Sequence, residues 1–175
     1  PNGQNATFDF QSIVTASKRI TVRFTKTSAQ AELTQENAYY KFEGATYDIF
    51  EAKGDAHVGS ITTDNKGKAA LALKPNTAYY AIETKAPVGF ALSKGRVDFT
   101  TEADGGDILL ADRAKTFSFV VVKRDAATGG AAQPSCSFAG AEYELTSASS
   151  PSFTAQATID EEGRCRFDGV PLGTI

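Results

Sequence analysis

The 175-residue sequence has no Met, no Trp, one His and two Cys. A chain without Met has no start residue, so we expect a processed protein or a piece of a longer one. The single histidine, His57, has no nucleophile motif near it, which excludes a Ser-His-Asp or Cys-His catalytic set of the usual kind. Two cysteines without a nearby histidine are too few for a zinc site. We therefore expect no enzymatic turnover, no metal and no cofactor.

Positive charge and long apolar runs are also scarce. The net charge is -3, so the sequence lacks the basic excess of proteins that bind nucleic acid or an anionic membrane. No apolar run approaches the roughly 20 residues that a helix needs to cross a bilayer. No signal peptide is present, although such a signal could lie outside this stretch. We therefore expect no nucleic-acid partner and no membrane insertion within this chain.

Apolar and polar residues alternate from Ile20 onward, which is the pattern of a half-buried β-strand. The inward row of this first strand ends in a lysine and holds Ile20, Val22, Phe24 and Lys26. Further strand-like runs follow, separated by turn signals such as the hairpin turn at Asp64–Gly67. These runs cover residues 39–50, 58–63, 68–73, the run ending at Glu83, 96–100 and 107–112, with a short helix or loop at 27–38. Short strands at such spacing predict an all-β sandwich.

The pattern then begins again. Its first strand repeats the inward row with Phe117, Phe119, Val121 and Lys123. Residues 140–145 and 160–163 repeat residues 44–49 and 64–67 at nearly the same offset.

The repeat sets the expected domain boundaries. Residues 20–115 form one complete unit, and residues 116–175 form a second unit that ends before the counterpart of the Glu83 strand. Residues 1–19 are a linker or the tail of a preceding unit, because Phe8–Phe10 and the residues after it resemble the end of the complete unit.

Three ionisable residues stand at the ends of inward-facing rows: Lys26 on the first strand, Glu83 on the fifth and Asp112 on the last. A buried charge must be neutralised, paired or hydrogen-bonded. Burial disfavours an ammonium ion, and only a neutral amine attacks a carbonyl group. Two carboxyl groups in a dry pocket do not both ionise readily, so one stays protonated. Together the three residues indicate a site.

The stretch Tyr79–Phe90, with Glu-Thr-Lys-Ala-Pro-Val-Gly-Phe at its end, resembles the fifth strand of Cna B-type domains. These are the prealbumin-like, or SpaA-like, β-sandwich modules of Gram-positive adhesins and pilins. The resemblance covers residues 20–113 well and residues 117–175 as a second copy. It implies tandem Ig-like, prealbumin-like sandwich modules, one complete and one C-terminally truncated.

The resemblance also implies a chemistry, because such domains join a Lys on the first strand to an Asn or Asp on the last through a spontaneous isopeptide bond. Carried over, Lys26 is the nucleophile, Asp112 the electrophilic carboxyl group and Glu83 the group that moves protons. Asp112 stands where Asn is more usual in the family. Lys123 is the matching lysine of the second copy, whose partners would lie beyond Ile175. The alternative is a buried salt bridge without a covalent bond.

Cys136 and Cys165 lie in the second copy. In an extracellular protein such a pair suggests a disulfide. The alternative is two separate buried thiols.

The implied function is structural: a rigid stalk in a cell-wall surface adhesin, extracellular and attached to peptidoglycan by sortase through a region outside this chain. Self-crosslinking happens once per molecule and is not turnover. A pilin shaft subunit ranks lower because the sequence has no Tyr-Pro-Lys motif. The rival is a module that binds a host-matrix protein, for which no surface can be identified, since Tyr39, Tyr40 and Tyr80 are expected in the core.

Overall fold

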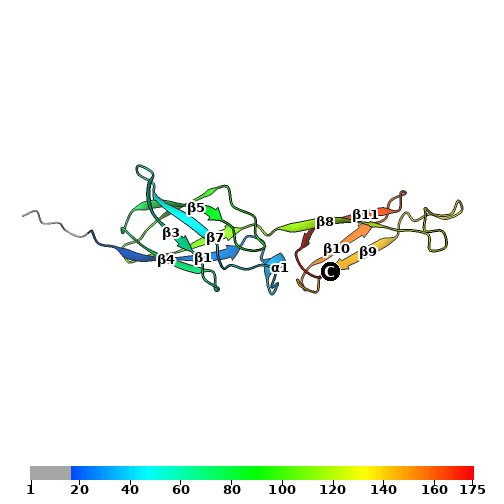
Figure 1. Ribbon diagram of the computed structural model, residues 1–175, viewed down its shortest axis with the longest axis horizontal. Helices are drawn as coiled ribbons and strands as arrows, with labels where there is room; N and C mark the ends of the chain where they lie inside the picture. Colours follow the sequence, from blue (N-terminus) through cyan, green and yellow to red (C-terminus); the bar gives the residue numbers. More distant parts are fainter. Residues whose placement is uncertain (1–16) are drawn as a thin grey trace, which may run out of the picture.

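The computed structural model describes residues 17–175, almost all of them in strands, loops and turns. The strands form two groups that lie end to end in an elongated molecule (Figure 1). The N-terminal group contains β1 (Ile20–Ser28), α1 (Ala31–Thr34), β2 (Thr46–Glu51), β3 (Ala56–Thr62), β4 (Lys68–Leu73), β5 (Ala78–Lys85), β6 (Arg96–Thr100) and β7 (Gly106–Asp112). The C-terminal group contains β8 (Thr116–Val122), β9 (Glu142–Thr146), β10 (Thr154–Thr158) and β11 (Arg164–Pro171). The expected all-β class is confirmed.

Two sheets enclose the core of the N-terminal group. In one sheet β1 lies between β4, to which it is antiparallel, and β7, to which it is parallel. The other sheet is antiparallel with the strand order β3-β2-β5-β6. Apolar side chains alternate with exposed ones along each strand, so each sheet has one inward face. The buried residues between the sheets include Val22, Phe24, Tyr47, Ile49, Leu73, Tyr79, Ala81 and Leu110.

The structure differs from the sequence-based expectation at the second strand. A strand was expected from residue 39, but β2 begins at Thr46. Tyr40 instead packs with Phe90 and Ala114 in a small separate cluster, so tertiary packing overrides the β propensity of the aromatic run. Tyr40 and Tyr80 are buried as expected, whereas Tyr39 is 52% exposed, which corrects its assignment to the core.

The C-terminal group has its own core. β8 pairs with β11 and β9 with β10, both antiparallel. The inward residues pack around Ile159, Cys165, Phe167 and Val170. Its hydrogen bonds repeat those of the first group: Lys26 N donates to Gly67 O at 2.7 Å, and Lys123 N donates to Gly163 O at 2.8 Å. β8 has one strand neighbour among the described residues, whereas β1 has two.

A joint of buried polar contacts connects the two groups. Asn37, in the loop after α1, donates through Nδ2 to Ser150 Oγ at 2.7 Å and to Leu172 O at 2.8 Å. Tyr40 OH donates to Lys115 O at 2.7 Å and accepts from Leu172 N at 2.9 Å. Asn37 is 4% exposed and Ser150 is fully buried. Because buried polar groups are costly when unpaired, these bonds favour one arrangement of the two groups.

Candidate functional site

Strand pairing brings Lys26, Glu83 and Asp112 together in the core of the N-terminal group. The parallel register of β1 and β7 places Ser28 beside Asp112, so Asp112 shares the inward face with Lys26. Glu83 comes from β5 in the opposite sheet, where it pairs with Tyr47 of β2. The lysine side chain thus ends between the two sheets.

The contacts at the lysine are short. Lys26 Nζ lies 2.5 Å from Asp112 Oδ1 and 3.3 Å from Glu83 Oε1, and all three side chains are at most 1% exposed. Lys26 Nζ also donates to Tyr47 OH at 2.5 Å. Ser93 N donates to Glu83 Oε2 at 2.8 Å, which orients that carboxyl group.

Tyr47 was missed as a site residue by the sequence reasoning, which counted it only as part of a strand. The available signal was its place on the same inward row as Ile49, opposite the strand of Glu83. Its depth in the core and its contact with Lys26 depend on how β2 and β5 pair, which the local sequence does not state.

The surroundings of Asp112 favour its protonated form more than water does. Burial raises the pKa of Asp112 to about 6; Lys26 opposes this shift, and the neighbouring Glu83 adds to it. The pKa of the Tyr47 phenol is also raised, first by burial and then by the neighbouring Glu83 and Asp112, so Tyr47 stays neutral. Among the described residues, no group donates a hydrogen bond to either Asp112 oxygen or to Glu83 Oε1; Lys26 Nζ lies within ion-pair distance of Asp112 Oδ1 and Glu83 Oε1.

This arrangement has the components for the condensation of an amine with a carboxylic acid. The amine and the acid are already in contact, which replaces an encounter by a fixed geometry. The two groups are charged as an ion pair, but the proton can move across their contact to give an amine and an acid. A buried ion pair loses hydration on both partners, and an amide in its place carries no charge.

The other predicted site residues do not join this cluster. Lys123 Nζ lies 5.9 Å from the centroid of the Tyr143 ring, and among residues 17–175 no carboxylate lies within ion-pair distance of it. Cys136 is exposed and Cys165 is buried, and both are free thiols. The suggested disulfide is therefore absent from this structure, because Cys165 points into the core of its sheet while Cys136 lies in a loop.

His57 contacts a serine and an aspartate on the exposed surface of β2 and β3. Its Nε2 lies 3.6 Å from Asp48 Oδ1 and 3.4 Å from Ser60 Oγ. Ser60 Oγ donates to Asp48 Oδ1 at 2.5 Å. In a Ser-His-Asp set the aspartate orients the ring through one nitrogen and the serine meets the other. Here both contacts fall on the same nitrogen, so the arrangement is not that of an activated serine.

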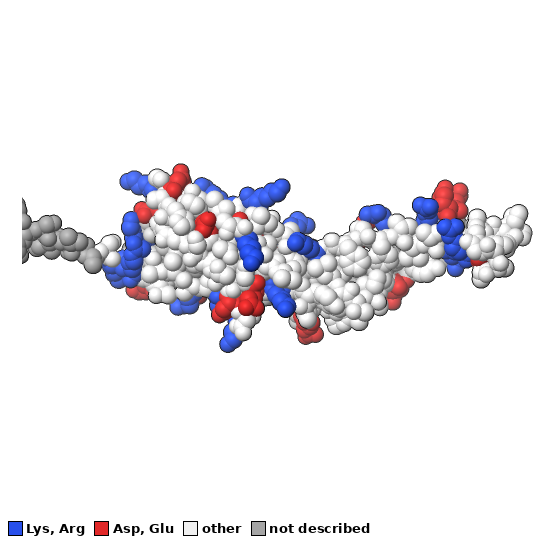
Figure 2. Space-filling model, viewed as in Figure 1, with Lys and Arg blue, Asp and Glu red and all other residues white. Residues whose placement is uncertain are grey.

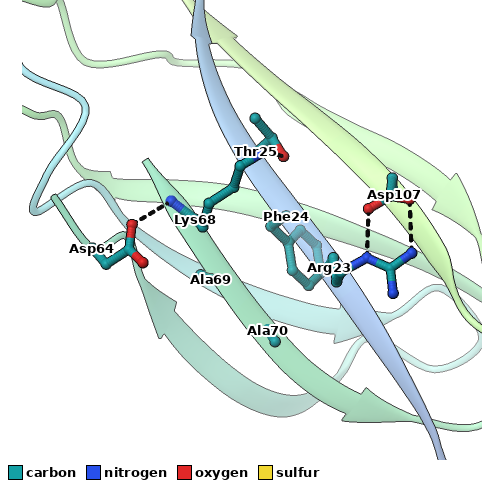
Figure 3. A pocket seen from close by; sticks show the side chains of 8 residues that line it. All are labelled: Arg23, Phe24, Thr25, Asp64, Lys68, Ala69, Ala70 and Asp107. Carbon is teal, nitrogen blue, oxygen red and sulfur yellow. Dashed lines mark hydrogen bonds and ion pairs between the residues drawn. The ribbon is translucent and has the colours of Figure 1, made fainter. Parts of the chain in front are cut away.

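A hollow on the outer face of β1, β4 and β7 holds charged side chains that satisfy one another (Figure 3). Arg23 donates to both carboxylate oxygens of Asp107, at 2.8 and 2.9 Å. Lys68 Nζ donates to Thr25 Oγ1 at 2.7 Å. These exposed pairs leave no unpaired charge that would identify a ligand.

Side chains of both signs are interspersed over the face shown in Figure 2. No helix within residues 17–175 combines the length and apolar character that a membrane span requires. The same residues contain no cluster of His, Cys, Asp and Glu suited to a metal ion.

Among solved structures, the chain is similar to the Bacillus anthracis TIE protein, with 21% identity and a TM-score of 0.52 over 85% of this chain and 26% of that one. It is also similar to BcpA, the major pilin subunit of Bacillus cereus, with 20% identity, a TM-score of 0.46, and coverage of 61% of this chain and 31% of that one. The shaft pilin SpaA from Lactobacillus rhamnosus GG shares 14% identity, with a TM-score of 0.42 over 84% and 80% of the two chains.

The chain spans 26% of the length of TIE and 31% of that of BcpA. No curated protein matches it. The family model of the SpaA prealbumin-like fold domain matches residues 21–115, which is more than half of the chain. This match confirms the resemblance drawn from the Tyr79–Phe90 stretch, and the chain belongs to the SpaA prealbumin-like family.

Proposed function

We propose that this chain is part of the stalk of a surface adhesin and that an isopeptide bond between Lys26 and Asp112 stabilises it. The observation that carries the proposal is the fully buried contact of Lys26 Nζ with Asp112 Oδ1 at 2.5 Å, with Glu83 beside both. Membership of the SpaA prealbumin-like family supports a structural, pilin-type role.

The proposed reaction is a condensation. Lys26 Nζ, as a neutral amine, attacks Cγ of protonated Asp112, and a bond forms between these two atoms. Glu83 takes a proton from the attacking nitrogen and passes it to the departing hydroxyl group. The bond from Cγ to that oxygen breaks and one water leaves. No oxidant, metal or cofactor takes part, and the reaction occurs once per molecule without turnover.

The bond would change how the protein carries tension. The chain enters the N-terminal group at β1 and leaves it from β7 toward β8 (Figure 1). A covalent link from Lys26 to Asp112 joins these two strands directly. Force applied to the two ends then bypasses β2 to β6, which need not unfold. This is a useful property in a surface protein exposed to shear.

We also propose that the two groups are tandem modules, with boundaries at 20–115 and 116–175. The repeated hydrogen bonds of Lys26 and Lys123 support this. Each main-chain nitrogen donates to the carbonyl oxygen of a glycine in a turn, Gly67 between β3 and β4 and Gly163 between β10 and β11. In this proposal β8 to β11 correspond to β1 to β4. Residues 1–19 remain a linker or the tail of a preceding module, and residues 1–16 lie outside the described part of the chain.

The joint between the modules supports a rigid stalk rather than modules connected by a flexible linker. Its bonds, from Asn37 and Tyr40 to the C-terminal group, are buried or half-buried. Attachment to peptidoglycan by sortase, through a region outside this chain, and an extracellular position at the cell wall complete the proposal. A pilin shaft is a variant of the same role. Binding of a host-matrix protein remains the alternative, to be tested by pull-down.

The test is the intact mass of the denatured, reduced protein. The wild type should weigh one water less than its sequence, and Glu83→Gln should show the full mass. An Asp112→Asn variant should lose ammonia in place of water. Glu51→Gln is the matched control, because Glu51 forms a part-exposed pair with Lys74 and should leave the water loss intact.

Fragmentation of the protein must then locate the mass loss in a pair of peptides that are joined through Lys26 and Asp112. A wild-type mass equal to that of the sequence refutes the bond and leaves a buried ionic cluster.

A further inference from the structure

A fourth buried side chain, Tyr47, completes the surroundings of the lysine amino group. It comes from β2, pairs with Glu83 across the sheet and is 2% exposed. Its hydroxyl oxygen lies 2.5 Å from Lys26 Nζ and accepts a hydrogen bond from it.

The three N–H bonds of an ammonium ion explain how this contact orients the amine. Lys26 Nζ has three N–H bonds when charged, and three oxygens surround it: Tyr47 OH, Asp112 Oδ1 and Glu83 Oε1. When the proton facing Asp112 moves to that carboxyl group, the lone pair left on nitrogen faces the same carboxyl group. The hydrogen bond to Tyr47 stays in place, and Glu83 Oε1 remains an ionic neighbour at 3.3 Å rather than a hydrogen-bond acceptor. The amine is then aimed at its electrophile.

Without the Tyr47 oxygen, one N–H bond would have no acceptor at that position. A buried donor without a partner is costly, so the amine would rotate to donate to Asp112. That rotation turns the lone pair away from the carbon it must attack.

We propose that Tyr47 is a positioning residue for the crosslink, holding one N–H bond of Lys26 so that the lone pair faces Asp112. This inference rests on the proposed Lys26–Asp112 bond. The raised pKa of the Tyr47 phenol keeps it neutral, so its oxygen accepts from the lysine without adding a third negative charge.

The C-terminal group contains the same pairing. Tyr143 lies on β9 at the position of Tyr47, and Lys123 lies over its ring at 5.9 Å from Nζ to the centroid. In the N-terminal group the corresponding distance is 5.2 Å. The lysine and the tyrosine therefore occur as a pair in both groups.

The test is the rate of bond formation in Tyr47→Phe, which keeps the ring and removes the hydroxyl group. Protein is kept in denaturant from lysis, diluted to start folding, and sampled for intact mass. Loss of one hydrogen bond that orients the amine should slow bond formation by about tenfold. Folding, followed separately by circular dichroism, should keep its wild-type rate.

Tyr79→Phe is the matched control. Tyr79 is also buried, but its hydroxyl group accepts from Lys74 N, away from Lys26. This variant should form the bond at the wild-type rate.

The pH dependence of bond formation gives a readout that packing alone would not change. The groups that face the Tyr47 hydroxyl are Lys26 from β1, Glu83 from β5 and Asp112 from β7. The pH at half-maximal rate should move in Tyr47→Phe and stay in place in Tyr79→Phe. As a second variant, a ring-fluorinated tyrosine at position 47 keeps the hydroxyl group but weakens it as an acceptor, and should also slow the reaction.

Bond formation at the wild-type rate and pH midpoint in both position-47 variants overturns the role of Tyr47. Absence of the bond from the wild type is a separate result, which overturns the proposed function itself.

Discussion

The Glu83→Gln substitution offers the sharpest measure of what the proposed crosslink contributes. It replaces a carboxyl group by an amide of nearly the same shape, whose oxygen can still accept from Ser93 N. Lys26 and Asp112 remain as a neutral pair at 2.5 Å. The folded site therefore keeps its packing, and Lys26 and Asp112 still neutralise each other, while the group that moves protons is gone. We expect a folded protein without the bond.

The expected loss of stability follows from the chain between residues 26 and 112. A crosslink that closes a loop of this length restricts the unfolded chain by about 4 to 5 kcal/mol, by analogy with a disulfide. For a module of this size, such a change lowers the midpoint of thermal unfolding by roughly 20 to 35 °C.

Differential scanning calorimetry of the wild type and Glu83→Gln measures this difference, with the intact mass of each sample determined in parallel. Glu51→Gln is again the control, because a part-exposed ion pair such as Glu51 with Lys74 contributes less than about 1 kcal/mol. The reasoning fails if Glu83→Gln lacks the bond and still unfolds within about 1 kcal/mol of the wild type. It also fails if Glu83→Gln forms the bond at the normal rate.

Two further predictions concern acidity and the joint between the groups. Above a pH of about 6 the Asp112 carboxyl group is ionised, so it can take a proton from the Lys26 ammonium group and give the amine and the acid that react. Below the Asp112 pKa of about 6 this carboxyl group already holds a proton, so it cannot take one from Lys26 and the amine is not formed. Bond formation, timed by intact mass, should therefore slow by about tenfold per pH unit below that value, and a rate that rises on acidification contradicts this. Asn37→Ala should leave buried Ser150 without its donor, at a cost of about 1 to 3 kcal/mol to the joint. NMR relaxation should then show the two groups tumbling more independently, whereas the exposed Asn65→Ala should not; equal tumbling in both variants would show that the joint does not depend on Asn37.

Local patterns in the sequence were sufficient for the class of fold and for the residues at the ends of the inward rows. Alternation with a period of two tells which side chains of a strand share a face, so Lys26, Glu83 and Asp112 could each be assigned to the core. The residues of Asp64–Gly67 likewise located a turn, because its hydrogen bonds are made within a few residues. The expected hairpin is wrong, since β3 pairs with β2 and β4 pairs with β1 in separate sheets. The family, recognised from Tyr79–Phe90, is confirmed, while the covalent bond stays a prediction.

Tertiary structure decided what depends on contacts between distant segments. Tyr40 lies outside the strand that was expected to contain it, because it packs against Phe90, which is far along the chain. Tyr47 became a neighbour of Lys26 because β2 pairs with β5, and no pattern within β2 specifies that pairing. The joint between Asn37 and Ser150 was equally invisible, since it joins a polar loop of one group to a polar loop of the other. Periodicity fixes the face on which a side chain lies, but only the folded chain fixes which side chains meet there.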